Sequence, residues 1–195
     1  AGVAGLHLED QVNPKRCGHL DGKAVVDLDT AVKRIRAAVD ARRDPDLVIM
    51  ARTDIRGVEG MEAAIDRAKA LEAAGADAIF PEALTDSNDF ARFSSEVKVP
   101  LLANMTEFGK TPFMTAAEFA ALGYKMVIWP VSALRMAAKA HEELYATLKA
   151  EGWAKPLVHR MQTRAELYAT IGYHEFEALD SSIARSAIPN GNPDA

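Results

Sequence analysis

Residues 47–82 read LVIMARTDIRGVEGMEAAIDRAKALEAAGADAIFPE, and this stretch decides the fold class. It begins with a short apolar run of strand length at 47–51 and ends with another at 77–81. Between them, the segment from Gly60 has helical periodicity and is rich in helix formers. A strand, a helix and a second strand in this order are typical of the βαβ unit of a parallel sheet covered by helices.

The same alternation continues on both sides of this stretch. Further strand-length runs lie at 3–8, 99–104 and 125–130, which brings the number of expected strands to about five. Helical segments begin at Asp29 and at Thr115, and the second has the capping-box pattern of Thr115 with Glu118. The sequence therefore predicts an α/β fold with a parallel sheet.

The pattern changes after the fifth expected strand. Residues 132–152 read as one long helix, and a second helix begins near 161 after the break at Pro156. We expect three segments: an α/β part at 1–152, C-terminal helices at 153–186, and an irregular tail at 187–195.

Composition excludes several classes of protein. The 195 residues are 49% hydrophobic and 26% charged, which is typical of one globular domain. No apolar run approaches the ~18 residues of a membrane span. A membrane is therefore not an expected partner. The 23 Lys and Arg against 28 Asp and Glu give a net charge of −5 with no basic stripe, so a nucleic acid is not an expected partner either. A single cysteine indicates a reducing compartment, and we expect a cytoplasmic protein.

Polar residues follow each expected strand, where the ligand sites of parallel α/β folds lie. Side chains alternate along a strand, so His7 shares a face with Glu9, as do Met50 with Arg52 and Phe80 with Glu82. A single polar strand end is explained by the loop that follows it, but four consecutive strands with different ionic or amide groups favour a site. These residues are Glu9, Asp10, Arg52, Thr53, Asp54, Glu82, Asn104 and Thr106, with Ser132 and Arg135 after the fifth strand.

The loop after the first strand, DQVNPKRCGHLDGKAVVD at 10–27, is longer than the ~12–15 residues above which loops are usually functional. Its only cysteine, Cys17, is preceded by Lys15 and Arg16 and followed by Gly18 and His19. Cationic neighbours favour a thiolate, and glycine lets the backbone approach a ligand. A buried structural cysteine is the alternative, but it suits an apolar neighbourhood.

The cations Lys15, Arg16, Arg52 and Arg135 predict a locally positive pocket for a small polycarboxylate or phosphate compound. The carboxylates Glu9, Asp10 and Glu82 are oxygen donors of the kind that Mg²⁺ takes. They could instead be ion-pair partners of the arginines, the reading we favour for Asp10. Zinc is disfavoured because His7 and Cys17 have no companions at zinc-ligand spacing.

The motifs HLED and KRCGH resemble the isocitrate lyase and phosphoenolpyruvate mutase superfamily, and NMTEFG resembles its methylisocitrate branch. The likeness continues through VIMARTD, IFPEA, WPVSALR and MQTRAELY, which is essentially the whole chain. It implies an Mg²⁺-dependent (or Mn²⁺-dependent) lyase that splits 2-methylisocitrate into pyruvate and succinate in propionate breakdown. The alternative substrates are isocitrate and another substituted malate. The alternative to an enzyme is a catalytically silent chain.

The resemblance also implies roles for individual residues. Cys17 matches the family's catalytic acid and base. Its cationic neighbours Lys15, Arg16 and His19 would tune this thiol, and we expect Lys15 and His19 to be catalytic residues with it. Glu9 matches a carboxylate that reaches the metal through water. The substrate-contacting positions are Cys17, Gly18, Arg52, Glu82, Asn104, Met105, Thr106, Arg135 and Arg164.

The family's fold is a (β/α)8 TIM-type barrel, assembled into a homotetramer in which C-terminal helices exchange between subunits. Five strands in 195 residues are fewer than the eight of a barrel of ~250 residues. We therefore expect this chain to supply the C-terminal five βα units and the C-terminal helices, with the direct metal ligands in an N-terminal part that precedes it. An open, doubly wound five-stranded sheet is the alternative that fits the strand count alone.

Overall fold

The structure of the protein is a computed structural model that describes residues 2–18, 20 and 22–184. It divides into two compact units, of which the first ends at Met136 and the second begins at Ala137. This division falls inside a long helix, whereas the sequence analysis placed the boundary at residue 152.

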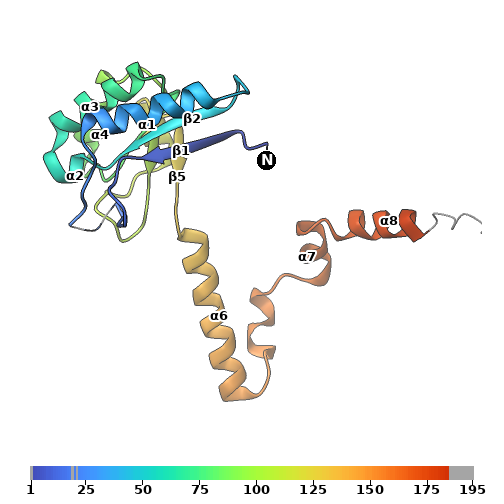
Figure 1. The fold of residues 1–195 in the computed structure, drawn as a ribbon. Coiled ribbons are helices and arrows are strands. Elements are labelled where there is room, and N and C mark those ends of the chain that lie inside the picture. The colour runs from blue at the N-terminus through green and yellow to red at the C-terminus, as the bar shows by residue number, and fades with distance from the viewer. Residues whose placement is uncertain (1, 19, 21, 185–195) are drawn as a thin grey trace, which may run out of the picture. The chain divides into compact units, whose positions relative to one another are not determined.

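The first unit contains five parallel strands (Figure 1): β1 (Gly5–Glu9), β2 (Val48–Thr53), β3 (Ala78–Pro81), β4 (Leu102–Asn104) and β5 (Met126–Ile128). They pair in chain order, β1 with β2, β2 with β3, and β4 with β5. An isolated parallel bridge between Ile79 and Leu101 joins β3 to β4. This order has no reversal of the kind that a doubly wound sheet has at its switch point. The predicted α/β class is confirmed.

One face of the sheet carries the main core, to which four helices contribute: α1 (Leu28–Ala41), α3 (Met61–Ala73), α4 (Ser87–Glu96) and α5 (Ala116–Ala121). The strands contribute Ala51, Ile79 and Ala103 to this core, where they pack with helix residues such as Leu71 and Phe93. The opposite face holds a second apolar cluster, made by the strands alone from Met50, Ala78, Phe80 and Leu102. A doubly wound sheet has helices on both faces, so the one-sided arrangement disfavours that alternative.

Local signals fix where these helices begin. Asp27 caps α1 by accepting a hydrogen bond from the Thr30 amide at 2.8 Å. At α5, Thr115 and Glu118 form the predicted capping box, with the Thr115 amide donating to Glu118 Oε2 at 2.6 Å. The capping-box prediction is confirmed.

The sequence analysis did not predict α4 or the short α2 (Arg56–Glu59). The sequence of α4, SNDFARFSSE, contains Ser, Asn and Asp, which are weak helix formers. The helix forms because Asp86 caps it and because Phe90 and Phe93, one turn apart, are both buried in the core. Tertiary burial thus outweighs local propensity here.

The second unit consists of helices: most of α6 (Ser132–Glu151), a 3₁₀ segment η1 (Lys155–Arg160), α7 (Arg164–Thr170) and α8 (Tyr173–Ala184). The start of α6 at Ser132 and its end before Gly152 confirm the long-helix prediction. The tail predicted as irregular at 187–195 lies outside the described residues. None of the described helices is both long and apolar enough to span a membrane.

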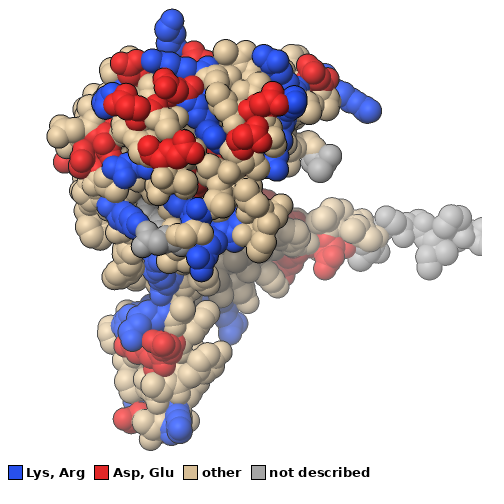
Figure 2. Space-filling model, turned by 60° about the vertical axis from the view of Figure 1, so that its left-hand side comes forward, with Lys and Arg blue, Asp and Glu red and all other residues tan. Residues whose placement is uncertain are grey.

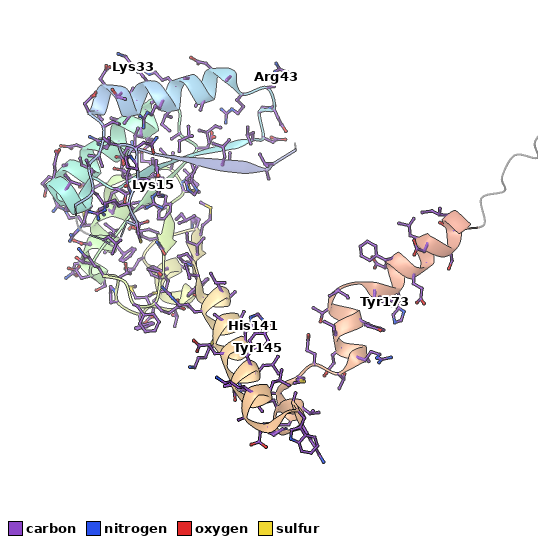
Figure 3. All side chains as sticks on the ribbon, turned by 60° about the horizontal axis from the view of Figure 1, so that its bottom comes forward. Lys15, Lys33, Arg43, His141, Tyr145 and Tyr173 are labelled. Carbon is purple, nitrogen blue, oxygen red and sulfur yellow. The ribbon has the colours of Figure 1, made fainter. Side chains whose placement is uncertain are left out.

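Nothing among the described residues of the second unit is buried. Its helices instead expose large apolar side chains, including Tyr145, Phe176, Leu179 and Ile183, as does Trp153 in the turn after α6. His141 and Tyr145 lie one turn apart on α6, and Tyr173 begins α8 (Figure 3). As far as it is described, to residue 184, the second unit has helices whose apolar faces lack a core of their own.

Candidate functional site

The carboxyl ends of β1, β2 and β3 meet in a cluster around Arg52. Its Nε lies 3.0 Å from Asp54 Oδ2 and 3.5 Å from Glu9 Oε2, and its Nη2 lies 3.2 Å from Glu82 Oε2. The guanidinium also lies 4.9 Å from the centre of the Phe80 ring. The structure therefore brings together the polar ends of three consecutive strands, on the face that carries no helices.

Arg52 is firmly cationic in this setting. Burial by itself lowers the pKa of its guanidinium, but the hydrogen bond to Asp54 and the charges of Glu82, Asp54 and Glu9 outweigh it and raise that pKa above its ordinary value. The pairing also fixes the side chain, because three carboxylates on three different strand ends hold it.

Glu82 lies at the floor of the cluster and is only 1% exposed. Asn104, at the end of β4, donates from Nδ2 to both carboxylate oxygens of Glu82 at 3.2 and 3.3 Å. The backbone of Gly18 packs directly on the Glu82 side chain, so that any side chain at position 18 would collide with it. The loop that carries Cys17 is thus brought to the carboxyl ends of β2, β3 and β4.

The loop at 10–27 is closed at its base by antiparallel pairing. Gln11 and Val25 form a bridge, and the Val26 amide donates to the Asp10 carbonyl at 2.8 Å. Inside the loop, the Leu20 amide donates to the Cys17 carbonyl at 3.0 Å. Cys17 is exposed, so the alternative of a buried structural cysteine is wrong. His19, predicted as a catalytic residue, lies outside the described residues.

Three of the four cations of the predicted positive pocket, Lys15, Arg52 and Arg135, have acidic partners within the chain. Lys15 Nζ lies 2.8 Å from Glu9 Oε2, and Arg135 Nη1 lies 3.3 Å from Glu107 Oε2. Together with the three carboxylates around Arg52, these contacts compensate the charges of Lys15, Arg52 and Arg135. On the face in Figure 2, basic and acidic side chains are mixed over the upper part of the first unit, and basic side chains gather over its lower part. Figure 3 labels Lys15 at the β1 end of this cluster.

Asp10 is an ion-pair partner, as the sequence analysis favoured. Its Oδ2 lies 3.0 Å from Arg67 Nη1 and accepts from Thr53 Oγ1 at 2.7 Å, while its Oδ1 accepts from the Asp54 amide at 2.9 Å. All these groups are buried. Asp10 therefore ties β1 and β2 to α3, beneath the cluster.

The predicted contact residues that follow β4 lie in different surroundings. The side chain of Met105 packs into the core on the helix-covered face, so only its backbone belongs to the rim. Glu107 accepts from Ser132 Oγ at 2.8 Å and pairs with Arg135, and the Ser132 bond holds the pKa of Glu107 below its ordinary value. This group joins the β4 loop to the start of α6. Thr106 is buried beside it.

The loops after β3, β4 and β5 each contain a non-glycine residue with positive φ: Ala83 at 56°, Phe108 at 62° and Val131 at 69°. For a β-branched residue such as Val131 this conformation is an outlier. Backbone strain of this kind clusters at functional sites, where the surrounding structure holds it in place. The strained residues thus coincide with the rim of the cluster.

The described residues do not form a metal centre. Among them there is no group of three or more His, Cys, Asp and Glu side chains suited to hold an ion. Glu9, the carboxylate predicted on the metal side, directs its Oε2 to Lys15 and Arg52. The residues described here therefore do not by themselves fit Mg²⁺.

Arg164 is the one predicted contact residue in the second unit, where it begins α7 after the capping box of Thr163 and Glu166. Its substrate-binding role stays a prediction.

Three residues beside the cluster were not singled out in the sequence analysis: Gln11, Lys23 and Gly57. Gln11 bonds the backbone of Arg16, Lys23 Nζ lies 3.5 Å from Asp54 Oδ1, and a methyl group on Gly57 would lie 2.8 Å from Lys23 Nζ. Gln11 continues the alternation of His7 and Glu9, so the period-two pattern could have revealed it. Lys23 gave no signal, because the burial of a lysine depends on contacts between distant segments. Gly57, in a segment not expected to be helical, gave none either.

Comparison with known proteins places this geometry in context. Residues 1–149 match the family described as phosphoenolpyruvate phosphomutase. The chain is 51% identical over 190 residues to 2-methylisocitrate lyase of Bacillus subtilis (strain 168). The aligned region covers 97% of this chain and 62% of that protein.

Solved structures give the same picture. A crystal structure of 2,3-dimethylmalate lyase, a member of the PEP mutase/isocitrate lyase superfamily, has a TM-score of 0.86 and 39% identity, with 98% of this chain and 64% of that chain covered. Phosphonopyruvate hydrolase, solved with oxalate and Mg++, has a TM-score of 0.78 and 28% identity, with 95% and 63% covered. The chain spans under two thirds of the length of each of these proteins.

Proposed function

The chain belongs to the phosphoenolpyruvate phosphomutase family, and from this premise we propose that it forms part of a carbon–carbon lyase that cleaves 2-methylisocitrate into pyruvate and succinate. The observation that carries the proposal is the packing of Gly18 on Glu82 beside Arg52, because it brings the KRCGH loop to the strand ends. The 51% identity to a protein named 2-methylisocitrate lyase supports the choice of substrate.

The reaction requires a proton donor and fixed positive charge. When the substrate alkoxide collapses, its carbon–oxygen bond becomes the carbonyl of pyruvate and the carbon–carbon bond breaks. The electron pair moves to the departing four-carbon fragment, which becomes succinate when it takes a proton. In this proposal Cys17 donates that proton as a thiol, and the proton that the substrate hydroxyl loses returns the resulting thiolate to the thiol.

Arg52 holds a substrate carboxylate in this proposal. Its contacts with Glu9, Asp54 and Glu82 use Nε and Nη2, which leaves Nη1 outside these contacts. A guanidinium already held in position loses little freedom when a carboxylate binds it, which favours precise placement. The remaining proposed contacts are Gly18, Glu82, Asn104, the Met105 backbone, Thr106, Arg135 and Arg164.

Magnesium enters the proposal only through Glu9. Phosphonopyruvate hydrolase was solved with Mg++, and Glu9 is the carboxylate that we expect near such an ion, through water. Because the described residues do not form a metal centre, none of the steps above passes through the ion.

We further propose that the five strands are part of a (β/α)8 barrel. Two observations support this: the strands neighbour one another in chain order, and the helices cover one face only, as in a barrel whose helices form an outer ring. The exposed apolar faces of the second unit support helix exchange within a homotetramer. The single cysteine remains our reason to propose a cytoplasmic location.

A second candidate substrate is another substituted malate, favoured by the TM-score of 0.86 to 2,3-dimethylmalate lyase. Isocitrate is the third candidate, and it differs from 2-methylisocitrate by one methyl group. A pocket that holds this methyl gains only ~1–3 kcal/mol from it, or roughly 10–200-fold in kcat/KM.

The test is a comparison of kcat/KM for the three substrates with the complete enzyme loaded with Mg²⁺. We expect 2-methylisocitrate to be preferred, with residual cleavage of isocitrate. Equal or faster cleavage of either competitor would reject the substrate assignment, and absence of cleavage of all three would reject the lyase proposal itself.

A further inference from the structure

Lys23 is a buried lysine at the end of the loop that carries Cys17. Its side chain is only 4% exposed, and its ammonium lies 3.5 Å from Asp54 Oδ1, which is fully buried. The same ammonium donates a hydrogen bond to the carbonyl oxygen of Gly18. Lys23 therefore links the residue after Cys17 to the carboxyl end of β2.

The structure provides a slot for this ammonium. A methyl group on Gly57, in α2, would lie 2.8 Å from Lys23 Nζ and 3.2 Å from its Cε. The backbone of Gly57 is not among those with positive φ, so glycine is needed there for space and not for conformation. The slot opens on a cavity of about 400 Å³ that is lined in part by Gly18, Lys23 and Gly57.

A second clamp holds the other side of Cys17. Gln11 Nε2 donates to the Arg16 carbonyl at 2.9 Å, and Gln11 Oε1 accepts from the Arg16 amide at 2.8 Å. Gln11 is itself buried. The backbone is thus held at residue 16 by Gln11 and at residue 18 by Lys23, while the Cys17 side chain between them stays exposed.

Stability alone does not account for a lysine at this position. A buried charge must recover its loss of hydration, and apolar side chains of similar volume are often as stable in its place. What an apolar side chain cannot do is bond the Gly18 carbonyl and Asp54 at once. The charge of Lys23 is therefore better explained by a need to hold the Gly18 carbonyl in position beside Asp54.

We propose that Lys23 is a positioning residue that holds the Gly18 carbonyl against β2 and so fixes the Cys17 thiol relative to Arg52 and Glu82. Gly57 is the second part of this device, because only a residue without a side chain admits the ammonium. The role of Cys17 in this inference rests on the proposed function.

The first experiment removes and restores the ammonium in the complete enzyme. Lys23→Ala lacks the atoms of an n-propylammonium ion, which the adjacent cavity can admit. We expect kcat to fall about 10- to 100-fold with little change in KM, since small misplacements of a reacting group have effects of this size. Added n-propylammonium should restore part of kcat, whereas tetramethylammonium, which has no N–H to donate, should not. Lys33→Ala on the exposed face of α1 is the matched control and should keep wild-type kinetics.

The second experiment displaces Lys23 without changing it. Gly57→Ala favours the helix by propensity and moves only the flexible end of the lysine, so the protein should fold. It should nevertheless lower kcat as Lys23→Ala does, and the double variant should show no further fall, because both changes break one contact.

A third readout does not depend on activity. Hydrogen exchange of the amides in the 16–26 segment should be faster in Lys23→Ala and in Gly57→Ala than in wild type, and unchanged in Lys33→Ala. Unchanged exchange in both variants, a wild-type kcat in Lys23→Ala, or additive losses in the double variant would overturn the proposal. If the wild-type enzyme does not cleave 2-methylisocitrate, the proposed function fails while hydrogen exchange still decides the role of Lys23.

Discussion

Phe93 on α4 is fully buried in the first unit, whereas Phe176 on α8, the same residue type on a helix of similar length, keeps 67% of its surface exposed in the second. The contrast extends to the units as a whole. Helices of the first unit pack on a sheet, and the described helices of the second bury none of their residues. Both sets of helices have apolar residues at helical spacing.

The difference shows that amphipathic periodicity predicts a helix but not its partner. A helix gains most of its stability from burial of its apolar face. The first unit supplies that burial within the chain. The second unit exposes apolar surface of the kind that marks interaction sites, in agreement with the proposed exchange of helices between subunits.

The largest expected effect tests whether the chemistry belongs to the first unit. In the complete enzyme, Cys17→Ser should lower kcat by about 10²- to 10⁴-fold, the usual contribution of a positioned acid, while KM changes little. Steady-state kinetics with 2-methylisocitrate measures both constants. Near-normal turnover would remove Cys17 from the mechanism and leave the first unit with substrate binding alone.

The next effect concerns stability. Phe93→Ala should reduce the free energy of unfolding by about 3–5 kcal/mol, because it leaves a cavity in the core. Phe176→Ala should instead weaken assembly, so that its effect depends on protein concentration. Denaturant unfolding together with sedimentation velocity separates the two.

The control for this pair is the dependence of each loss of stability on protein concentration. If Phe176→Ala lowers stability equally at every protein concentration and leaves assembly intact, the second unit has a core within its own chain and the contrast between the units is wrong.

A smaller effect compares the same capping device in both units. Thr115 caps α5 and Thr163 caps α7, each with a glutamate three residues on. Phe119 anchors α5 in the core, so Thr115→Ala should lower the global free energy of unfolding by about 1 kcal/mol. Thr163→Ala should mainly increase local hydrogen exchange in α7, since this helix buries nothing in the described chain. Equal global losses would argue against the difference.

The smallest effect is a dependence on pH. Backbone hydrogen bonds from Thr115 and Thr163, followed by the side-chain bonds, lower the pKa of Glu118 and Glu166 from the ordinary value of 4.5. A carboxyl whose pKa is lower in the folded state than in the unfolded state stabilises the fold at pH values above its unfolded pKa. This contribution is lost as the pH falls through the folded pKa. The loss caused by Thr115→Ala should therefore shrink on acidification. Because Thr115→Ala keeps the backbone N–H and removes only the hydroxyl, carboxyl ¹³C titration should show the Glu118 pKa moving part of the way toward 4.5 in that variant, and an unaltered titration would exclude the side-chain bond as a cause.

The sequence predicted the parts of this molecule that depend on local order. Apolar runs gave five parallel strands, and Thr115 with Glu118 marked a real capping box. Alternation placed Arg52 and Glu82 on one face, where they form an ion pair. Helix α4 escaped prediction because its local composition opposes a helix and only the burial of Phe90 and Phe93 secures it.

The ion-pair partners of the site's cations could not be predicted for a related reason. Lys15, Arg52 and Arg135 are visible in the sequence as cations, but their partners Glu9, Asp54, Glu82 and Glu107 become partners only through the fold. Lys23 is the extreme case, since its neighbours Asp54 and Gly57 lie more than thirty positions away in the chain.

The pairing of Arg52 with three carboxylates also bears on how a ligand arrives. A cluster whose charges compensate one another presents little field beyond a Debye length, about 8 Å at physiological ionic strength, and the chain as a whole carries a net charge of −5. Arg52 itself would therefore exert little long-range attraction on a polycarboxylate. Its selection would begin on contact, at the Nη1 edge of Arg52 that the three carboxylates leave open.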